Sequence, residues 1–487
     1  MEKLIKVVQT VAKNKVILFL FSRYATYFIH FINSLFIAVY LGPYYLGIWG
    51  FISLITQYVN QINFGIAHSV TALISVHKKK EFYVQKIIGT SLTMLLGLSL
   101  VVVLFFIANA VFNLQLGAKY NFSTYAPIVV LIGILGYFNS LFSSVFRVYG
   151  RLFEIAFNQT VFPLLILASI LFFKKDELLW ALVGANFLAF LVSFVLYVSR
   201  SPVSLKPTFI FSLFKTIQKK GWHLFVYNSS FYFIIISTRS FVSGFYSVEE
   251  FGYFTFAFSL ANVVLMVLQA FSFLIFPKLL NRFASATADQ NNALLKKLRD
   301  AYVTTSHLLV HIAILLFPLF LVVFPQYSSV SEAFVLIALA VVLYSNSFGY
   351  SGLLIAKGHE KRLSRLSLLA LIINIITAFV LIRVFHVPFA MVIIATMISY
   401  FIYVFMLGVM GRKMLGLPTS LVSVVKDIYP LRLLIPYVTT LGLLFFSVPE
   451  YYYILSLILF VVLNFKVLSK LKTLMKSIIS NPNFINI

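Results

Sequence analysis

Fourteen long apolar runs constrain the fold of this chain more than any other feature. Each has about the length of a helix that crosses a bilayer, and a helix satisfies its own backbone hydrogen bonds in lipid. The last two are joined only by Pro449 and Glu450, so twelve spans plus a hairpin is an alternative. The pattern predicts an all-α integral membrane protein with about 14 transmembrane helices. The runs cover residues 16–40, 46–76, 87–111, 125–145, 155–173, 178–198, 223–246, 251–277, 302–324, 332–355, 366–384, 388–410, 433–448 and 451–467.

Composition excludes the soluble classes of protein. The 487 residues are 61% hydrophobic and 10% charged, whereas soluble domains are roughly 45–50% apolar and about 25% charged. The chain has no cysteine, which removes disulfides, thiolate nucleophiles and Cys-ligated metal sites. No nucleophile elbow, phosphate-cradling loop or nucleotide-binding motif occurs in the sequence. We therefore expect a protein that is not an enzyme and needs no cofactor.

The basic residues predict how the chain is oriented in the membrane. With the N-terminus placed inside, the inner segments carry 32 Lys and Arg and the outer segments carry 4, while Arg23 and Arg239 fall within runs. Because cytoplasmic loops are the ones enriched in Lys and Arg, both termini are predicted to be cytoplasmic. This distribution also accounts for the net charge of +25 without a nucleic-acid partner. The first run is too long for a signal-peptide core, so we expect an uncleaved first span.

The loops predict the division of the chain. The longest outer loop, 112–124, is too short for an extracytoplasmic catalytic domain. The inner loops at 199–222 and 411–432 are longer, basic and interrupted by proline, which is typical of amphipathic segments on the anionic inner leaflet. We expect a six-helix lobe, a cytoplasmic linker, a second six-helix lobe, a second linker, and a final helix pair with a basic tail. Their boundaries are 1–200, 201–222, 223–410, 411–432 and 433–487.

An internal repeat relates the two lobes. The segment 41–51 is similar to 246–256, with Gly47 matching Gly252 at an offset of 205 residues. The segments 138–150 and 345–358 match at offsets of 207–208, and 180–187 matches 390–397 at 210. The common order and offset favour a duplication over chance similarity between apolar helices. Six spans per half would give both halves the same orientation, a parallel repeat with a central cleft.

Polar side chains interrupt the first two runs of each half. In the first run, Arg23, Thr26, His30 and Asn33 follow at steps of three, four and three residues, which places them on one helical face. The second run carries Gln57, Gln61 and His68. The corresponding runs of the second half carry Asn228, Tyr232, Arg239 and Ser243, then Ser259, Asn262 and Gln269.

These stripes predict a water-filled cleft lined by basic and amide groups, with three alternatives. The stripes could instead form hydrogen bonds that only hold helices together, and Arg23 or Arg239 could extend to a membrane surface. All 13 Asp and Glu lie in loops or tails, outside the interior of every run. A cavity with cations and no anions suits a negatively charged substrate, and the Arg fork matches phosphate oxygens. His307 and His311 have a spacing seen in metal sites but no third ligand, so no metal is expected.

The sequence resembles the polysaccharide flippases, of the O-antigen and capsule repeat-unit type, within the multidrug/oligosaccharidyl-lipid/polysaccharide exporter superfamily. The similarity covers essentially the whole chain. Members often have an Asp-Arg pair in the seventh span, whereas here Thr238 precedes Arg239. The segments that carry the resemblance are 37–58, 62–70, 237–254, 351–362 and 371–382.

The resemblance implies two six-helix lobes, alternating access, and transport of an undecaprenyl-pyrophosphate-linked oligosaccharide across the cytoplasmic membrane for cell-surface polysaccharide biosynthesis. A polysaccharide polymerase would be a possible partner. A lipid II flippase or a multidrug antiporter of the same superfamily are the alternatives. The antiporter would be expected to carry a membrane carboxylate, and the lipid II flippase more arginines in its cavity.

Overall fold

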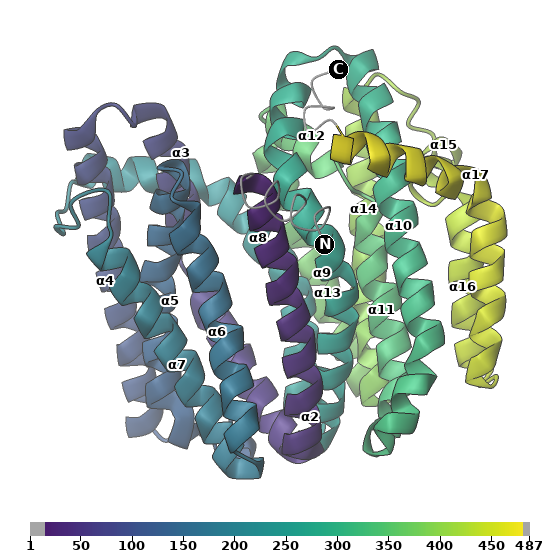
Figure 1. Ribbon diagram of the computed structural model, residues 1–487, viewed down its shortest axis with the longest axis horizontal. Helices are drawn as coiled ribbons and strands as arrows, with labels where there is room; N and C mark the ends of the chain where they lie inside the picture. Colours follow the sequence, from purple (N-terminus) through teal and green to yellow (C-terminus); the bar gives the residue numbers. More distant parts are fainter. Residues whose placement is uncertain (1–14, 481–487) are drawn as a thin grey trace, which may run out of the picture. The chain divides into compact units, whose positions relative to one another are not determined.

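The computed structural model describes residues 15–480, and the side chains of 15–23, 220, 265, 267–278, 281 and 471–480 lie outside the described set. The described chain is built from α-helices joined by short loops and four short 3-10 helices (Figure 1). The α-helices are α2 (Lys15–Gln61), α3 (Ile66–His77), α4 (Glu81–Val111), α5 (Phe122–Val148), α6 (Leu152–Phe172), α7 (Lys175–Ser199), α8 (Phe211–Phe245), α9 (Val248–Ser285), α10 (Ala288–Val323), α11 (Ser331–Ser345), α12 (Tyr350–Ala356), α13 (Glu360–Arg383), α14 (Ile394–Met414), α15 (Leu421–Ile428), α16 (Leu431–Phe445) and α17 (Tyr453–Ser480). The 3-10 helices are η1 (Ala118–Tyr120), η2 (Pro325–Val330), η3 (Phe389–Ile393) and η4 (Glu450–Tyr452).

The all-helical membrane class is confirmed, but the count of fourteen spans is not. Within the described residues, ten helices are long and apolar enough to cross a bilayer, or eleven if α15 and α16, bent by 74°, form one broken span. The first two predicted runs, 16–40 and 46–76, fall largely in the single element α2. The predicted runs 223–246 and 251–277 lie in α8 and α9, where some side chains lie outside the described set.

Helix α2 changes direction at Gly42. This residue has φ 72° and ψ 172°, which is not helical and is a conformation that glycine adopts without a steric penalty. Pro43 follows, at a position where a new helix tolerates proline. Figure 1 shows the chain turning back at the lower end of α2. The break lies between the first two predicted runs, so the sequence located it correctly.

The chain divides into two compact units. Unit 1 comprises Met1–Ser229 with Ser247–Gly252, and unit 2 comprises Ser230–Tyr246 with Tyr253–Ile487. Residues 211–222, expected in a linker, form the first part of α8. The lobe boundaries proposed from the sequence stay a prediction.

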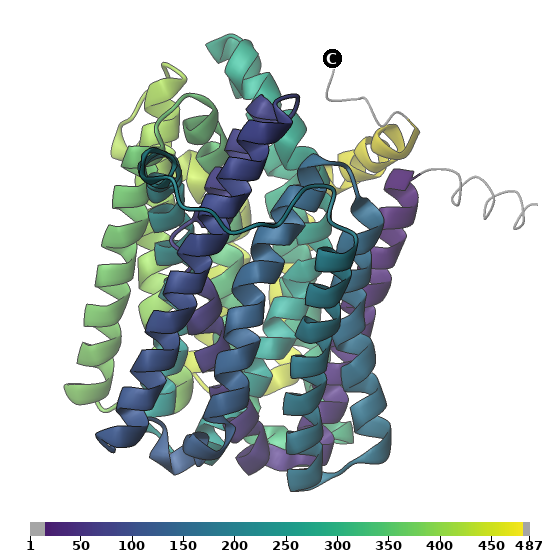
Figure 2. The ribbon, with the colours of Figure 1, turned by 90° about the vertical axis from the view of Figure 1, so that its left-hand side faces the viewer.

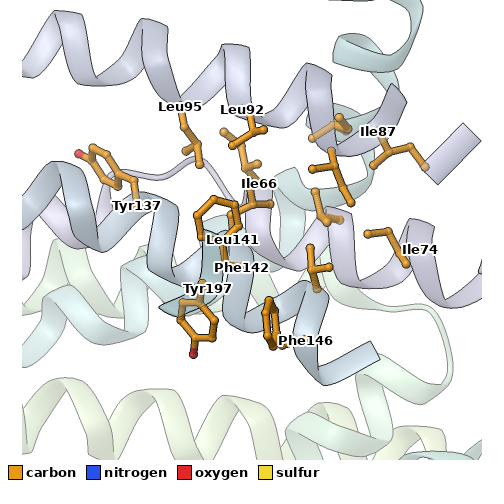
Figure 3. Packing of buried hydrophobic residues seen from close by; sticks show 14 of the residues in the cluster. Ile66, Ile74, Ile87, Leu92, Leu95, Tyr137, Leu141, Phe142, Phe146 and Tyr197 are labelled. Carbon is orange, nitrogen blue, oxygen red and sulfur yellow. The ribbon is translucent and has the colours of Figure 1, made fainter. Parts of the chain in front are cut away.

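The core of unit 1 lies among α3, α4, α5 and α7. Helices α4 to α7 run side by side (Figure 2). Large apolar side chains such as Leu141, Phe142 and Phe146 of α5 fill the space against α3, α4 and Tyr197 of α7 (Figure 3). Each of these side chains is almost completely buried. The opposite faces of α4 and α6 expose leucine, valine and phenylalanine, as expected for helices that contact lipid.

Unit 2 is organised around α11. From Ala333 to Ala340 every residue of this helix is buried, which is typical of a helix surrounded by others. Helices α10, α14 and α16 pack against it. The predicted run 332–355 covers α11 and α12, with a break before Gly349, whose φ is 85°.

Candidate functional site

Two of the predicted site residues fall outside the description. Arg23 lies in α2 and Gln269 in α9, and the side chains of both lie outside the described residues. Their predicted roles therefore rest on the sequence alone.

The polar stripe of α2 faces α6 within unit 1. The Asn33 amide nitrogen donates to the carbonyl oxygen of Pro163 at 2.7 Å, and the His30 ring centroid lies 5.9 Å from that of Phe162. The Thr26 hydroxyl also contacts α6. The three side chains thus share a helical face, as their spacing predicts. Asn33 is buried and connects two helices, whereas His30 is only partly buried.

The second polar stripe lies on the later part of α2 and on α3. Gln57 and Gln61 are half-buried, and His68 of α3 is exposed. The Gln61 amide donates to the Ser229 hydroxyl of α8 at 3.2 Å. Asn228, one residue earlier on α8, is half-buried and forms no hydrogen bond with another described residue. In unit 1, these contacts leave the amides of Gln61 and Asn228 able to form further hydrogen bonds.

Arg239 of α8 is the buried cation among the predicted site residues of unit 2. Its exposed fraction is 2%, and its guanidinium carbon lies 4.8 Å from the centroid of the Phe258 ring on α9. This distance is typical of a cation–π contact. Asn262 lies one turn further on α9 and donates its amide to the Phe258 carbonyl at 2.9 Å. The structure thus brings the predicted residues Arg239 and Asn262 to the same aromatic residue.

A polar cluster that the sequence analysis did not identify fixes this part of α8. The Thr238 hydroxyl lies 2.8 Å from that of Thr396 on α14. The Asn374 amide of α13 lies 3.1 Å from the Thr238 hydroxyl and 2.9 Å from that of Ser237. All these groups are buried and neutral. A single asparagine within the apolar run 366–384 was the only sequence signal for this cluster.

The two histidines of α10 are hydrogen-bonded within unit 2. The His307 Nε2 lies 2.9 Å from the Asn346 amide oxygen, and the His311 Nδ1 lies 2.7 Å from the His307 carbonyl. No group of three potential metal ligands occurs among the described residues. Among the described residues, the predicted site thus contributes amides and histidines in unit 1, and a guanidinium beside an aromatic ring and an amide in unit 2. Groups of these kinds can bind anions and polar hydroxylated molecules.

Comparison with known proteins gives a family match and a fold match. The model of a family described as "Polysaccharide biosynthesis protein" matches residues 12–281. No curated relative matches the chain. A solved multidrug resistance MATE family transporter of the MOP superfamily, in an inward-facing conformation, is 11% identical with a TM-score of 0.66, over 82% of this chain and 98% of its own.

Two further solved structures share the fold. The outward-facing conformation of a multidrug resistance MATE family transporter is 11% identical with a TM-score of 0.58, over 82% of this chain and 93% of its own. The lipid II flippase MurJ, in an inward closed conformation, is 15% identical with a TM-score of 0.62, over 93% of this chain and 98% of its own. At these identities the likeness concerns the fold alone, which this chain shares with those transporters.

Proposed function

Because the chain belongs to the polysaccharide biosynthesis protein family, we propose that it is a flippase for a lipid-linked oligosaccharide. Its substrate would be an oligosaccharide on a polyprenyl pyrophosphate, carried from the inner to the outer leaflet of the cytoplasmic membrane. The product would supply the assembly of a surface polysaccharide such as O-antigen or capsule. A polymerase acting on the outer side is the expected partner.

Arg239 is the observation that carries this proposal. An arginine placed in the membrane interior costs at least about 2.5–3.5 kcal/mol, and Arg239 is buried within α8. A pyrophosphate supplies the negative charge that would compensate this cost, and the guanidinium fork matches its oxygens. In the present conformation Phe258 covers one face of the guanidinium. The substrate would reach Arg239 only after that ring moves.

The amide and histidine side chains are proposed to contact the sugar. Gln57, Gln61 and Asn228 lie close together along α2 and α8 in unit 1, while Asn262 adjoins Arg239 in unit 2. Amides both donate and accept hydrogen bonds, so they can pair with sugar hydroxyls of varied orientation. The proposed lining of the cationic cleft is completed by five further residues, His30, His68, Asn33, Arg23 and Gln269.

Alternating access is the proposed mechanism. Solved transporters with this fold have been captured facing inward and facing outward. The substrate would enter from the cytoplasmic side, where the basic loops and both termini are predicted to lie. The apolar exposed faces of the helices would let the polyprenyl chain remain in lipid while the charged head crosses the protein.

Arg239→Ala gives the direct test. We expect this variant to abolish surface polysaccharide at unchanged protein level, and Arg239→Lys to restore it in part, because lysine keeps the charge but loses the fork. Arg383→Ala is the matched control, since Arg383 also lies over a phenyl ring, at 4.6 Å, but is exposed. Normal polysaccharide in the Arg239→Ala variant would refute the proposed role.

Lipid II is a second candidate substrate. The fold match to MurJ spans 93% of this chain, more than the 82% of the MATE matches. Flipping assays in proteoliposomes that contain either lipid II or a repeat-unit oligosaccharide on the same polyprenyl pyrophosphate would separate the two. Transport of lipid II alone would replace the proposal made here.

A further inference from the structure

A basic cavity opens at one end of unit 2. It has a volume of about 400 Å³ and lies among α10, α14, α15, α16 and α17. Five cationic side chains and two carboxylates line it. They are Lys296, Arg299, Arg412, Lys426 and Arg432, with Asp300 and Asp427. None of these residues belongs to the site proposed for transport.

The first carboxylate is shared by two arginines. The Arg299 Nη1 donates to the Asp427 Oδ1 at 3.0 Å, and the Arg412 Nη1 lies 3.3 Å from the Asp427 Oδ2. The Tyr350 hydroxyl of α12 donates to the same Oδ2 at 2.5 Å. Because one carboxylate faces two guanidinium groups, this cluster keeps an excess of one positive charge.

The second carboxylate fixes the position of Arg432. The Arg432 Nη2 donates to the Asp300 Oδ1 at 2.7 Å, and its Nη1 donates to the side chains of Thr304 and Asn464. Arg432 is thereby tied to α10 and α17. The arginine has little freedom to leave the cavity wall, so this wall is already organised.

Two lysines complete the cavity without a partner. Lys296 of α10 and Lys426 of α15 are exposed, and neither forms a hydrogen bond or an ion pair with another described residue. With both carboxylates already engaged, three of the five positive charges of the lining are left uncompensated. An anion in the cavity would meet two free ammonium groups and an organised guanidinium wall.

Exposed apolar side chains lie on the helices that line the cavity. Leu421 and Val422 of α15 are 67% and 61% exposed, and Leu431 at the start of α16 is 68% exposed. On α17, Val462 and Phe465 are exposed as well. Side chains of this kind beside a basic cavity are expected where a protein enters the headgroup region of a bilayer.

The cavity is lined by α15, which lies with α12 at one end of unit 2 (Figure 1). The basic segments 278–299 and 412–432 supply its cations. These segments are among those predicted to be cytoplasmic. The inner leaflet is the one that offers anionic headgroups to such a site.

We propose that this cavity binds the phosphate group of an anionic membrane lipid, with the acyl chains against the exposed apolar side chains of α15, α16 and α17. The volume accommodates a phosphate with its glycerol, and the charge excess favours an anionic over a zwitterionic headgroup. Such a lipid would contact α10, α15 and α17 while its acyl chains remain in the bilayer. The inference is independent of what the protein transports.

The test compares lipids on the purified full-length protein in neutral detergent. The unfolding temperature is measured against added phosphatidylglycerol, with phosphatidylcholine as the neutral lipid and inorganic phosphate or glycerol phosphate as soluble anions. The variant Lys296→Gln/Lys426→Gln removes the two free charges of the cavity. The control Lys297→Gln/Lys413→Gln also removes two exposed lysines. Lys297 lies on α10 and Lys413 in the basic segment 412–432, but neither lysine lines the cavity.

We expect phosphatidylglycerol to raise the unfolding temperature of the wild type and the control more than phosphatidylcholine does. The half-saturating concentration should rise by about 10-fold to 30-fold in the cavity variant. Equal titrations in both double variants, or equal effects of the two lipids, would overturn the proposal. Equal stabilisation by the soluble anions, with the same lysine dependence, would assign the site to a free phosphate and refute the lipid. If the double variant is not obtained folded, Lys426→Gln alone provides the same comparison against Lys413→Gln.

Discussion

The contact between Gly47 and Gly252 gives the sharpest structural prediction. These glycines occupy corresponding positions of the sequence repeat, and in unit 1 they pack the start of α9 against α2. A Cβ built on Gly47 would lie 2.0 Å from the carbonyl oxygen of Val248, and one on Gly252 would lie 2.0 Å from that of Pro43. Small residues at such positions let two helix backbones approach closely in a membrane.

Replacing Gly47 by alanine should therefore force the helices apart. Ordinary van der Waals contact begins at 3.4 Å, so the Cβ and the Val248 oxygen must separate by about 1.4 Å, the difference between 3.4 and 2.0 Å. Neither atom belongs to a flexible side chain that could move away. Overpacking of this kind typically costs about 1–3 kcal/mol, which should lower the unfolding temperature by several degrees. Gly252→Ala should have a similar effect.

The measurement is thermal unfolding of the purified protein in detergent, with Gly97→Ala as the matched control. Gly97 lies inside α4 of the same unit, and a Cβ there would meet nothing within 4 Å. Its replacement should be neutral or stabilising by about 0.5–1 kcal/mol, because alanine favours the helix. If Gly47→Ala unfolds at the same temperature as Gly97→Ala, the close approach of α2 and α9 is refuted.

Other residues give equally direct tests. Asn374→Leu removes the amide that contacts three acceptors on α8 and should lower stability by about 1–2 kcal/mol in thermal unfolding, whereas the exposed Ile375→Leu should not. Exchanging Gln57 or Asn262 should change which oligosaccharide units are accepted in a flipping assay; a uniform loss of protein level instead would make both residues structural. An inside-negative potassium diffusion potential should accelerate flipping in proteoliposomes without a pH gradient, since a full charge crossing the field is worth ~2.3 kcal/mol per 100 mV. Dependence on a pH gradient alone would point to titration of His30 or His68.

The local features of the fold were accessible from the sequence. Long apolar runs predicted the helices, and the gap between the runs 16–40 and 46–76 contains Gly42, where α2 breaks. The spacing of His30 and Asn33 predicted one shared face, and both side chains do lie against α6. Helical periodicity is a short-range property, so it is visible without an alignment.

Long-range polar contacts were not accessible. Asp427 meets Arg299 across 128 residues and Tyr350 across 77, and no local pattern links three such positions. In the sequence, Asp427 lies in a basic segment. A carboxylate in such a segment is expected at the surface, so its position alone does not predict a cluster with arginines. The cluster of Thr238, Asn374 and Thr396 was missed for the same reason, since a threonine in an apolar helix can bond to the carbonyl oxygen one turn earlier instead of joining another helix.

The residue before Arg239 connects these findings to the energetics of transport. Thr238 occupies the position where members of the resembling family often have an aspartate, and here its hydroxyl belongs to a neutral cluster with Asn374 and Thr396.

No carboxylate lies in the interior of any apolar run, so the charge that the membrane-embedded residues contribute is positive in the empty protein. A pyrophosphate would neutralise much of it. The empty and loaded forms should then respond differently to the membrane potential, which would draw the positively charged empty form toward the inward-facing state by ~1–2 kcal/mol, because the charges cross only part of the field. If the substrate is the proposed lipid-linked oligosaccharide, outward movement of the nearly neutral loaded form would follow the substrate gradient, and polymerisation outside would keep that gradient steep.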